Sequence, residues 1–417
     1  MRLHLGLTSA IVVALAAVLA GCDGTSSEPE LATELSPAES RARGGPMSAL
    51  DASYTFSPPV FDIDATPDGS ILVAETVSPA TQPSPGVSIT TVKEIRRNGK
   101  AGVRDVVEIS TVKGSPINGL ESIGQGKFYA TGGALDLAVG AAVFHVSNGG
   151  ARLVGDIEEF EKVNDPDASF GPAWKTPACE AAAGFSAGPQ SNPYHLARLS
   201  GATVLVADAA GNTLLRVEMN GEVDLTAVFT PPTEDGSGSI SPTDWIVLFA
   251  IPGLTCYVQP VPTSVAVGPD NSIYVGELTG VAPANFAGLP APGLSRVWRI
   301  SPGAEGVVCP SADCQVVLSG LTSVIDLAVG PDGKLYVLEY DENGWAIAIG
   351  ALGGAPDPAG GTINRCDATT GVCEPIAQGL VLPGAITFDK WGDLWLLENN
   401  IGVPTPTVAA PTVRKLE

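Results

Sequence analysis

The chain has 417 residues, of which 22 are Lys or Arg and 45 are Asp or Glu, so its formal net charge at pH 7 is −23. So acidic a surface repels phosphate backbones and anionic lipid headgroups, which excludes nucleic acid as a partner. Hydrophobic residues make up 44% of the chain and charged residues only 16%, which predicts a large apolar core and excludes disorder for most of the length.

The N-terminal region has the features of a secretion signal. Residues 11–20 form an uninterrupted apolar run after a short polar start. The run leads into the tetrapeptide 19–22, Leu-Ala-Gly-Cys, which resembles a bacterial lipobox, the motif in which the Cys is lipid-modified and becomes the new N-terminus. We therefore expect residues 1–21 to be a lipoprotein signal peptide. An ordinary signal peptide cut nearby and an uncleaved anchor are the alternatives.

The segment that follows predicts a flexible tether. Residues 22–47 are rich in Ser, Glu, Pro and Ala and show no apolar period. Lipidation of Cys22 would hold the protein at the cell envelope outside the cytoplasm, in contact with a membrane only through the lipid. If Cys22 is not lipidated, the chain would be secreted.

The remaining six cysteines permit three disulfides in an oxidising compartment. Two pairs are close enough in sequence for local bridges, and the third pair follows by elimination: Cys366–Cys373, Cys309–Cys314 and Cys179–Cys256. Spacing alone does not prove this connectivity.

The strongest pattern in the chain is an internal repeat. Each copy is an apolar strand, a turn rich in Gly, Asp or Asn, and a second strand rich in Val, Ile, Tyr and Leu, which predicts a β-hairpin. Three copies are well preserved and three are degenerate: 61–75, 264–277 and 326–339, and then 118–131, 195–208 and 385–398. Six similar units of this length predict a repeat architecture.

Further strands complete each unit. A third strand follows every hairpin: 91–96, 142–146, 214–218, 296–300, 362–365 and 412–416. A fourth strand follows the first five: 105–109, 152–157, 223–229, 315–318 and 374–377. Four antiparallel strands repeated six times predict an all-β fold, a six-bladed β-propeller spanning residues 48–417. Because the chain ends after the third strand of its last unit, we expect residues 48–56 to supply the missing strand, so that an N-terminal strand closes the C-terminal blade.

The long connections fall on one face of this propeller. They are 77–90, 161–191, 230–260, 279–294, 341–361 and 399–411. Long loops over one end of a rigid scaffold are where binding usually occurs, so we expect a ligand or partner there. The alternative is that the loops only shield blade edges.

Aligning the six copies defines two polar columns. The first strand places in one column Asp62, Asn118, His195, Ser264, Asp326 and Ala385. The last position of the second strand forms the other: Glu75, Thr131, Asp208, Glu277, Glu339 and Glu398. We expect the first column to face the central channel and the acidic column, Glu75, Asp208, Glu277, Glu339 and Glu398, to form its rim.

The first column offers a candidate metal site. The residues Asp62, Asn118, His195 and Asp326 supply oxygen ligands and one imidazole, a set that suits Ca²⁺, Mg²⁺ or Mn²⁺ and, less well, Zn²⁺. The competing interpretations are a hydrated polar channel and acids that bond to strand-end amides. No nucleophile elbow, phosphate-binding loop or dinucleotide fingerprint is present, so no catalytic residue is assigned.

Several segments resemble the ScyD/ScyE family of secreted bacterial propellers. They are 191–197 (Ser-Asn-Pro-Tyr-His-Leu-Ala), 204–217, 261–280 and 324–333. The resemblance covers about residues 51–417, apart from the insertions at 161–191 and 230–260 and the cysteines. It implies an exported six-bladed propeller without implying an activity. More remotely, the hairpins are similar to NHL repeats, gluconolactonase-like propellers and virginiamycin B lyase, and Asn118-Gly119-Leu120 resembles a metal-binding turn of lactonase propellers.

Two functions are compatible with these features. The first is a monomeric, lipid-anchored extracytoplasmic propeller that binds a small ligand or an envelope protein on its loop-rich face and is not itself an enzyme. The second is a metal-dependent hydrolase or lyase of the gluconolactonase or virginiamycin B lyase type, acting on a lactone-like or cyclic substrate in the channel.

Overall fold

The structure is a computed structural model. It describes residues 53–77, 88–97, 104–114, 116–134, 139–147, 150–170, 178, 189–251, 254–280, 292–350, 357–403 and 405–416. The proposed signal peptide and tether, Cys22 and Cys179 lie outside these residues.

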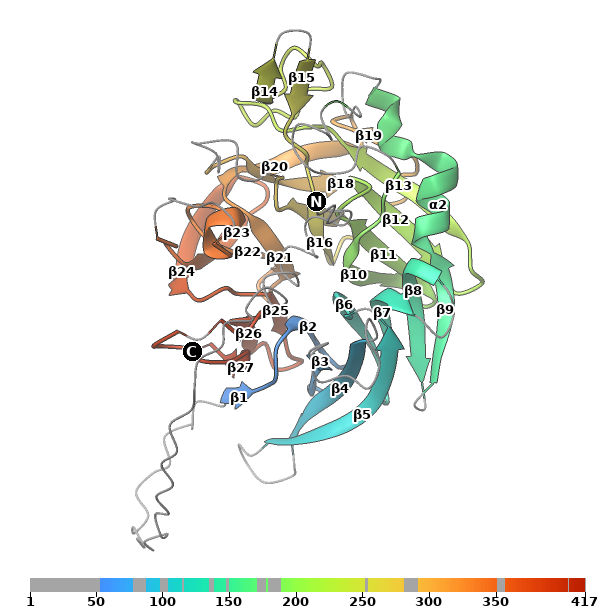
Figure 1. The fold of residues 1–417 in the computed structure, drawn as a ribbon, viewed down its shortest axis with the longest axis vertical. Coiled ribbons are helices and arrows are strands. Elements are labelled where there is room, and N and C mark those ends of the chain that lie inside the picture. Colours follow the sequence, from blue (N-terminus) through green and yellow to red (C-terminus); the bar gives the residue numbers. More distant parts are fainter. Residues whose placement is uncertain are drawn as a thin grey trace, which may run out of the picture.

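Six four-stranded antiparallel sheets are arranged as the blades of a six-bladed β-propeller, which confirms the predicted fold (Figure 1). Blade 1 consists of β2 (Val60–Ala65), β3 (Ile71–Val77), β4 (Ser88–Arg97) and β5 (Arg104–Gly114). Blade 2 consists of β6 (Gly119–Gly124), β7 (Lys127–Ala134), β8 (Val139–Ser147) and β9 (Gly150–Asp156). Blade 3 consists of β10 (Pro193–Ser200), β11 (Thr203–Asp208), β12 (Thr213–Glu218) and β13 (Val223–Phe229).

The second half of the chain forms the other three blades. Blade 4 consists of β16 (Pro262–Val267), β17 (Ile273–Glu277), β18 (Ser295–Ile300) and β20 (Cys314–Leu321). Blade 5 consists of β21 (Val324–Val329), β22 (Leu335–Glu339), β23 (Gly361–Asp367) and β24 (Val372–Leu380). Blade 6 consists of β25 (Ala385–Phe388), β26 (Leu394–Glu398), β27 (Thr412–Lys415) and β1 (Ser53–Thr55). The first strand of every repeat lies innermost (Figure 1).

The ring closes through β1, as the sequence predicts. This strand pairs antiparallel with β27 and opposes Thr55 to Thr412. Beyond the strand, the Phe56 N–H donates to the carbonyl of Pro411 at 2.8 Å. The two ends of the propeller therefore meet in one sheet, which leaves no open edge at β27.

Turn chemistry explains why the inner hairpins form. In blade 1 the Asp68 carboxylate accepts a hydrogen bond from the Ser70 N–H at 3.1 Å, and Gly69 adopts a φ of 88°. Blade 5 repeats the turn, with Asp332 accepting from the Lys334 N–H at 3.1 Å and Gly333 at a φ of 73°. The Asp caps the turn and the Gly supplies the left-handed backbone that the reversal requires.

The core lies between neighbouring blades. In one interface, the rings of Phe229 (blade 3) and Trp298 (blade 4) have centroids 5.7 Å apart, and both side chains are fully buried. At the closure, Val60 of blade 1 packs with Trp395 and Val413 of blade 6. Each sheet therefore buries both faces, which explains the apolar runs along its inner strands.

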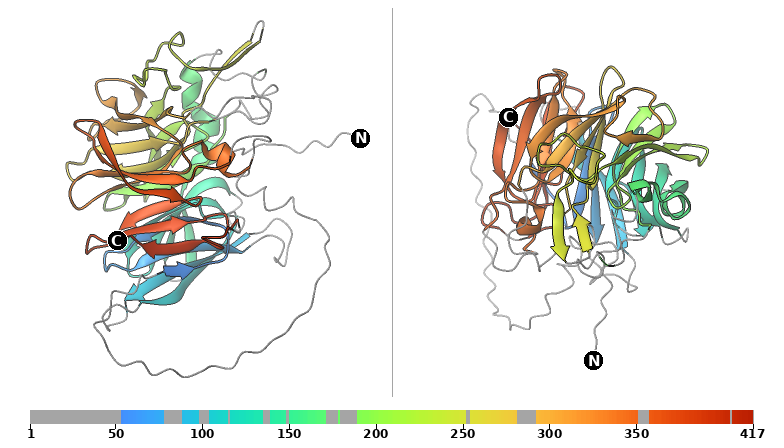
Figure 2. Two further views of the ribbon diagram at one scale, coloured as in Figure 1. Left: turned by 90° about the vertical axis from the view of Figure 1, so that its left-hand side faces the viewer. Right: turned by 90° about the horizontal axis from the view of Figure 1, so that it is seen from above.

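A few elements lie outside the repeat. They are the helices α2 (Ile157–Asn164), η3 (Pro166–Phe170) and α4 (Trp345–Ala348), and the strands β14 (Val247–Ile251), β15 (Leu254–Tyr257) and β19 (Val307–Cys309). The hairpin β14–β15 extends away from the ring of blades (Figures 1 and 2). Strand β19 adds in parallel to the outer edge of blade 3. The insertions 161–191 and 230–260 thus contain regular structure that the repeat pattern did not predict.

Two predicted disulfides are confirmed. Cys309 pairs with Cys314, and Cys366 pairs with Cys373 across the β23–β24 hairpin. Cys256 is also disulfide-bonded. Its pairing with Cys179 stays a prediction, because Cys179 lies outside the described residues.

Candidate functional site

A shared irregularity of the inner strands positions the candidate site. The antiparallel register shifts between Val60 and Ile63 in β2, and between Pro193 and Leu196 in β10. In β21 it shifts immediately before Asp326. Bulges of this kind re-aim side chains and are common beside functional sites. Here they occur where Asp62, His195 and Asp326 lie.

These three side chains form what we call the central cluster. Nδ1 of His195 lies 3.0 Å from Oδ1 of Asp326, and Nε2 lies 3.9 Å from Oδ1 of Asp62. One ligand atom from each residue lies within 4.8 Å of the other two. Only 3–6% of each residue is exposed. Three blades far apart in sequence thus contribute to one buried group.

The carboxylates of the central cluster also cross-link blades. Oδ2 of Asp62 accepts from the Leu120 N–H in blade 2 at 2.6 Å. Oδ2 of Asp326 accepts from the Ile386 N–H in blade 6 at 2.7 Å. The interpretation that these acids bond to strand amides is therefore correct for both residues. A carboxylate oxygen has two lone pairs, so these bonds leave each group able to accept again.

Two polar atoms beside these bonds have no hydrogen-bond partner among the described residues. They are Nε2 of His195 and Oδ1 of Asn118, and both are buried. The Asn118 amide is held in place because its Nδ2 donates to the carbonyl of Pro193 at 3.2 Å. Buried polar atoms normally have partners, so these two indicate a bound water or ion.

Burial and mutual charge shift the proton affinities of the cluster. Burial lowers the pKa of the His195 imidazole, but the carboxylates of Asp62 and Asp326 outweigh that effect and raise the pKa to about 9. Burial raises the pKa of Asp62 to about 7, against the opposing influence of His195. In the absence of a metal, a proton on His195 therefore balances the charge of the carboxylates at neutral pH.

A second tier of charged groups lies further along the inner strands, and the sequence analysis missed it. Asp64 accepts from the Ser122 N–H at 2.6 Å, and Nε of Arg198 lies 3.8 Å from Oε1 of Glu121. Burial raises the pKa of Asp64 to about 7 and that of Glu121 well above its usual range. Strand periodicity could have revealed Asp64, because residues two apart share a face and Asp62 was already assigned to the channel.

The acidic column does not form an open rim. All five acids are at least 92% buried and hydrogen-bonded to protein groups: Glu75, Asp208, Glu277, Glu339 and Glu398. In four blades the acid accepts from a backbone N–H of the segment that leads into the inner strand. For example, Oδ1 of Asp208 accepts from the Asn192 N–H at 2.6 Å. These carboxylates therefore fix the inner strands, and they are buried instead of lining an exposed rim of the channel.

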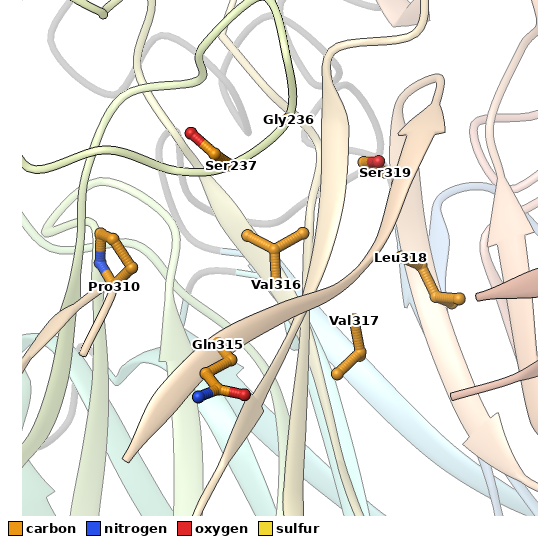
Figure 3. Close-up of a pocket in the computed structure, with 8 residues that line it drawn as sticks. All are labelled: Gly236, Ser237, Pro310, Gln315, Val316, Val317, Leu318 and Ser319. Carbon is orange, nitrogen blue, oxygen red and sulfur yellow. The ribbon is translucent and has the colours of Figure 1, made fainter. Parts of the chain in front are cut away.

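An outer pocket of about 350 Å³ lies away from the central cluster. It is formed between strand β20 and the segment at Gly236 and Ser237 (Figure 3). Its side chains include Val316 and Leu318, and none of its lining residues belongs to either polar column. It therefore adds nothing to the candidate site.

The described residues contain no helix long and apolar enough to cross a membrane. The two confirmed disulfides fit an oxidising compartment outside the cytoplasm.

No family model matches the sequence, and no curated protein matches it. The resemblance to the ScyD/ScyE family is therefore not confirmed. Solved structures with a similar fold include a putative oxidoreductase (glucose dehydrogenase) from Thermus thermophilus. It is 16% identical, with a TM-score of 0.47, covering 88% of this chain and 100% of that one.

Two further structures are comparably similar. A gluconolactonase from Xanthomonas campestris is 11% identical, with a TM-score of 0.46, covering 87% of this chain and 88% of that one. A calcium-binding protein, regucalcin, from Agrobacterium tumefaciens is 10% identical, with a TM-score of 0.45, covering 87% and 92%. Similarity at this level says nothing about the chemistry of this chain.

Proposed function

We propose that this protein is an extracytoplasmic binding propeller that holds a divalent cation, Ca²⁺ or Mg²⁺, in its central cluster. One observation carries the proposal. Asp62, His195 and Asp326 come from three blades, yet their ligand atoms lie within 4.8 Å of one another. His195 also presents a buried Nε2 without a hydrogen-bond partner among the described residues.

The charge of the site favours a cation. Two buried carboxylates repel each other at this separation, and either a proton on His195 or a metal ion relieves the repulsion. A metal requires neutral imidazole and ionised carboxylates, so binding would release the His195 proton. Asn118 is the candidate for a fourth donor, because its buried Oδ1 has no hydrogen-bond partner among the described residues. The donor set is mainly oxygen, as Ca²⁺ and Mg²⁺ prefer, while the imidazole also admits Mn²⁺.

The burial of the cluster argues for an ion rather than a large substrate at its centre. With 3–6% of each residue exposed, the three side chains are accessible to very little solvent. The ion would then set the charge and rigidity of the inner strands, while a small ligand or envelope protein binds the loop-rich face. Lipidation of Cys22 would hold this face at the cell envelope.

Calorimetric titration of Ca²⁺ and Mg²⁺ into EDTA-treated protein tests the cation site. We expect Asp62→Asn/Asp326→Asn to remove one binding event. The control Glu222→Gln/Asp313→Asn removes two exposed carboxylates and should leave that event unchanged. Identical titrations for the two double variants would refute the central site. Mn²⁺ in a parallel titration measures how far the imidazole broadens selectivity.

The lipid anchor has a separate test. Mass spectrometry of membrane-extracted protein should show the mass of a diacylated Cys22 chain that lacks residues 1–21. Cys22→Ser should abolish the acyl mass. An intact mass that is the same with and without the substitution would rule the anchor out.

One observation favours the hydrolase or lyase as a second candidate. Burial brings the pKa values of Asp62 and Asp64 to about 7, where a carboxyl group can both donate and accept a proton. If the protein turns over lactones or cyclic esters, Asp64→Asn should abolish turnover while leaving the cation titration unchanged. If the metal-bound protein turns over no lactone and no cyclic ester, this candidate is excluded.

A further inference from the structure

An apolar group lies on the loop-rich side of the central cluster. Phe61, Tyr194 and Ile325 each come directly before one residue of the central cluster, in inner strands that run from the loop-rich end to the hairpin turns. All three are 1–3% exposed and belong to one hydrophobic core cluster, although they come from blades 1, 3 and 5. Because the residues that follow them meet at the central cluster, these side chains also lie near the central axis.

The short helix α4 packs against this apolar group. Trp345 and Ile349 are both 6% exposed and belong to the same hydrophobic core cluster. The Trp345 N–H donates to Oγ of Ser323 at 2.9 Å, and its Nε1 donates to the carbonyl of Thr279 at 3.1 Å. We call the five buried side chains the apolar cap: Phe61, Tyr194, Ile325, Trp345 and Ile349. An ion loses its hydration in such a layer at a high cost in free energy, so the apolar cap is a barrier to ions.

Side-chain exposure rises in the opposite direction, toward the hairpin turns that join the first and second strands. The side chains of the central cluster are 4–8% exposed. In the second tier, the side chain of Glu121 is 18% exposed and that of Arg198 41%, and Asp64 is half-buried. Asp64 is two residues beyond Asp62 in β2, and Arg198 is three residues beyond the histidine of the cluster in β10. At the hairpin-turn end, solvent-exposed charged groups therefore lie next to the central cluster.

Arg198 brings a positive charge to the two carboxylates of the second tier. Its Nε lies 3.8 Å from Oε1 of Glu121, and the guanidinium also interacts electrostatically with Asp64. An ion pair this long and this exposed contributes little to stability, so the guanidinium can move aside. A divalent cation is attracted by both carboxylates and repelled by Arg198, which competes with it for them.

We infer that a cation reaches the central cluster from the hairpin-turn end, past the second tier, and that the guanidinium of Arg198 controls its passage. This inference rests on the cation site proposed above. Asp64 and Glu121 concentrate cations at the entrance, and Arg198 sets the electrostatic barrier that each ion crosses on the way in and on the way out. The apolar cap separates the ion from the loop-rich face, so a ligand on that face binds without touching the ion.

Binding kinetics of Tb³⁺ test the passage. Tb³⁺ replaces Ca²⁺ at oxygen-rich sites, and a nearby excited aromatic ring sensitises its luminescence. Tyr194 provides that ring, because its centroid lies 4.7 Å from that of the His195 imidazole. Stopped-flow mixing of Tb³⁺ with the EDTA-treated full chain gives the association rate constant, and a chase with EDTA gives the dissociation rate constant. We expect Arg198→Gln to raise both at least about fivefold, because the barrier is crossed in both directions.

Arg299→Gln is the matched control. The Arg299 side chain is also 41% exposed, and it lies 3.3 Å from Asp270 in the turn between β16 and β17, at the same end of the propeller. It belongs to the third strand of blade 4 instead of an inner strand. Arg299→Gln should leave both rate constants at their wild-type values. Equal rate constants for the two arginine variants would overturn the inference.

A further substitution covers the case in which Arg198→Gln does not fold. Glu121→Gln removes an attracting charge and should lower the association rate constant, and an unchanged value would contradict the inference. Asp62→Asn/Asp326→Asn should abolish the sensitised signal. If that double variant keeps the signal, the central site itself is refuted. If it loses the signal while Arg198→Gln keeps wild-type rate constants, only the passage is refuted.

Discussion

Arg296 and Glu277 form a fully buried ion pair on adjacent strands of blade 4. Nε of Arg296 donates to Oε2 of Glu277 at 2.7 Å, and Nη2 donates to Oε1 at 3.0 Å. The same guanidinium donates to the carbonyls of Thr230 and Pro231, so it also joins blade 4 to the segment that leaves blade 3. These bonds use four of the five N–H groups of the guanidinium, and a buried pair held in this way is costly to break from one side.

We expect Arg296→Met to lower the free energy of unfolding by about 3–5 kcal/mol, because Glu277 would stay buried without its counter-charge. The control lies on the same strand. Arg299 contacts Asp270 at 3.3 Å with both side chains more than 40% exposed, and Arg299→Met should cost less than about 1 kcal/mol. Urea denaturation of both variants measures the difference, and similar losses would contradict the assignment.

The closing strand makes a prediction about truncation. Removing residues 1–57 deletes β1 and Phe56, exposes the edge of β27 and uncovers apolar surface at Trp395. We expect this form to melt at a lower temperature and to aggregate, because an unpaired edge strand templates association. Removing residues 1–47 should leave melting and size-exclusion behaviour unchanged. Equal melting temperatures for the two truncations would mean that β1 does not contribute to closure.

The Cys366–Cys373 bridge should stabilise blade 5 modestly. It closes a loop of 8 residues between directly paired positions of β23 and β24. Chain-entropy arguments for a loop of this size give about 2.5 kcal/mol, which Cys366→Ala/Cys373→Ala should remove. Guanidinium denaturation with and without reductant measures the contribution of this bridge to the free energy of unfolding. A variant as stable as the oxidised wild type would show that the native hairpin is strained by the bridge.

Glu339 gives a pH dependence with a defined sign. Burial raises its pKa from an ordinary value of 4.5 to about 7, despite the bond from the Thr322 N–H. The folded state therefore binds this proton more tightly than the unfolded chain does. The contribution of Glu339 to stability consequently falls as pH rises from about 4.5 to 7, with Asp62, Asp64 and Asp208 acting in the same direction.

Urea denaturation in EDTA between pH 4.5 and 7.5 checks this prediction. Glu339→Gln should flatten the decline, since Gln is neutral and can still accept from the Thr322 N–H while Asn364 reorients its amide. The exposed Glu374→Gln serves as the control and should keep the wild-type slope. If Glu339→Gln leaves the slope of the unfolding free energy against pH unchanged, groups other than Glu339 cause the pH dependence.

The repeat pattern predicted the blades well because the residues that specify the strands and turns of each unit lie within that unit. Alternating apolar residues specify the strands, and an Asp or Asn followed by Gly specifies the turn between them, as at Asp68 and Asp332. The strand order follows, because each hairpin must bury both faces against a neighbour. The segments between the repeated strands gave no such period, so α2, β19 and the β14–β15 hairpin were not foreseen.

Column alignment was less successful for the candidate site. It correctly selected Asp62, His195 and Asp326 as residues that meet, because equivalent positions of six blades surround one axis. The alignment could not show that Glu75 or Glu398 is buried against backbone amides. An acidic residue at a repeated position gives the same sequence pattern whether its side chain faces solvent or the backbone that precedes an inner strand.

The acidic, repetitive sequence by itself determined the number of blades, their strand order, the closure by residues near the N-terminus and two of the disulfides. All of these depend on interactions that are local or recur at a fixed period. Only the tertiary structure decided which carboxylates share a space. Glu161 and Asp208 are 47 residues apart in different kinds of element, and no periodicity relates them. They approach because α2 contacts β8 of blade 2 and shares an apolar cluster with blades 2 and 3, and because Gly211 leaves room between them. The sequence does not express this packing.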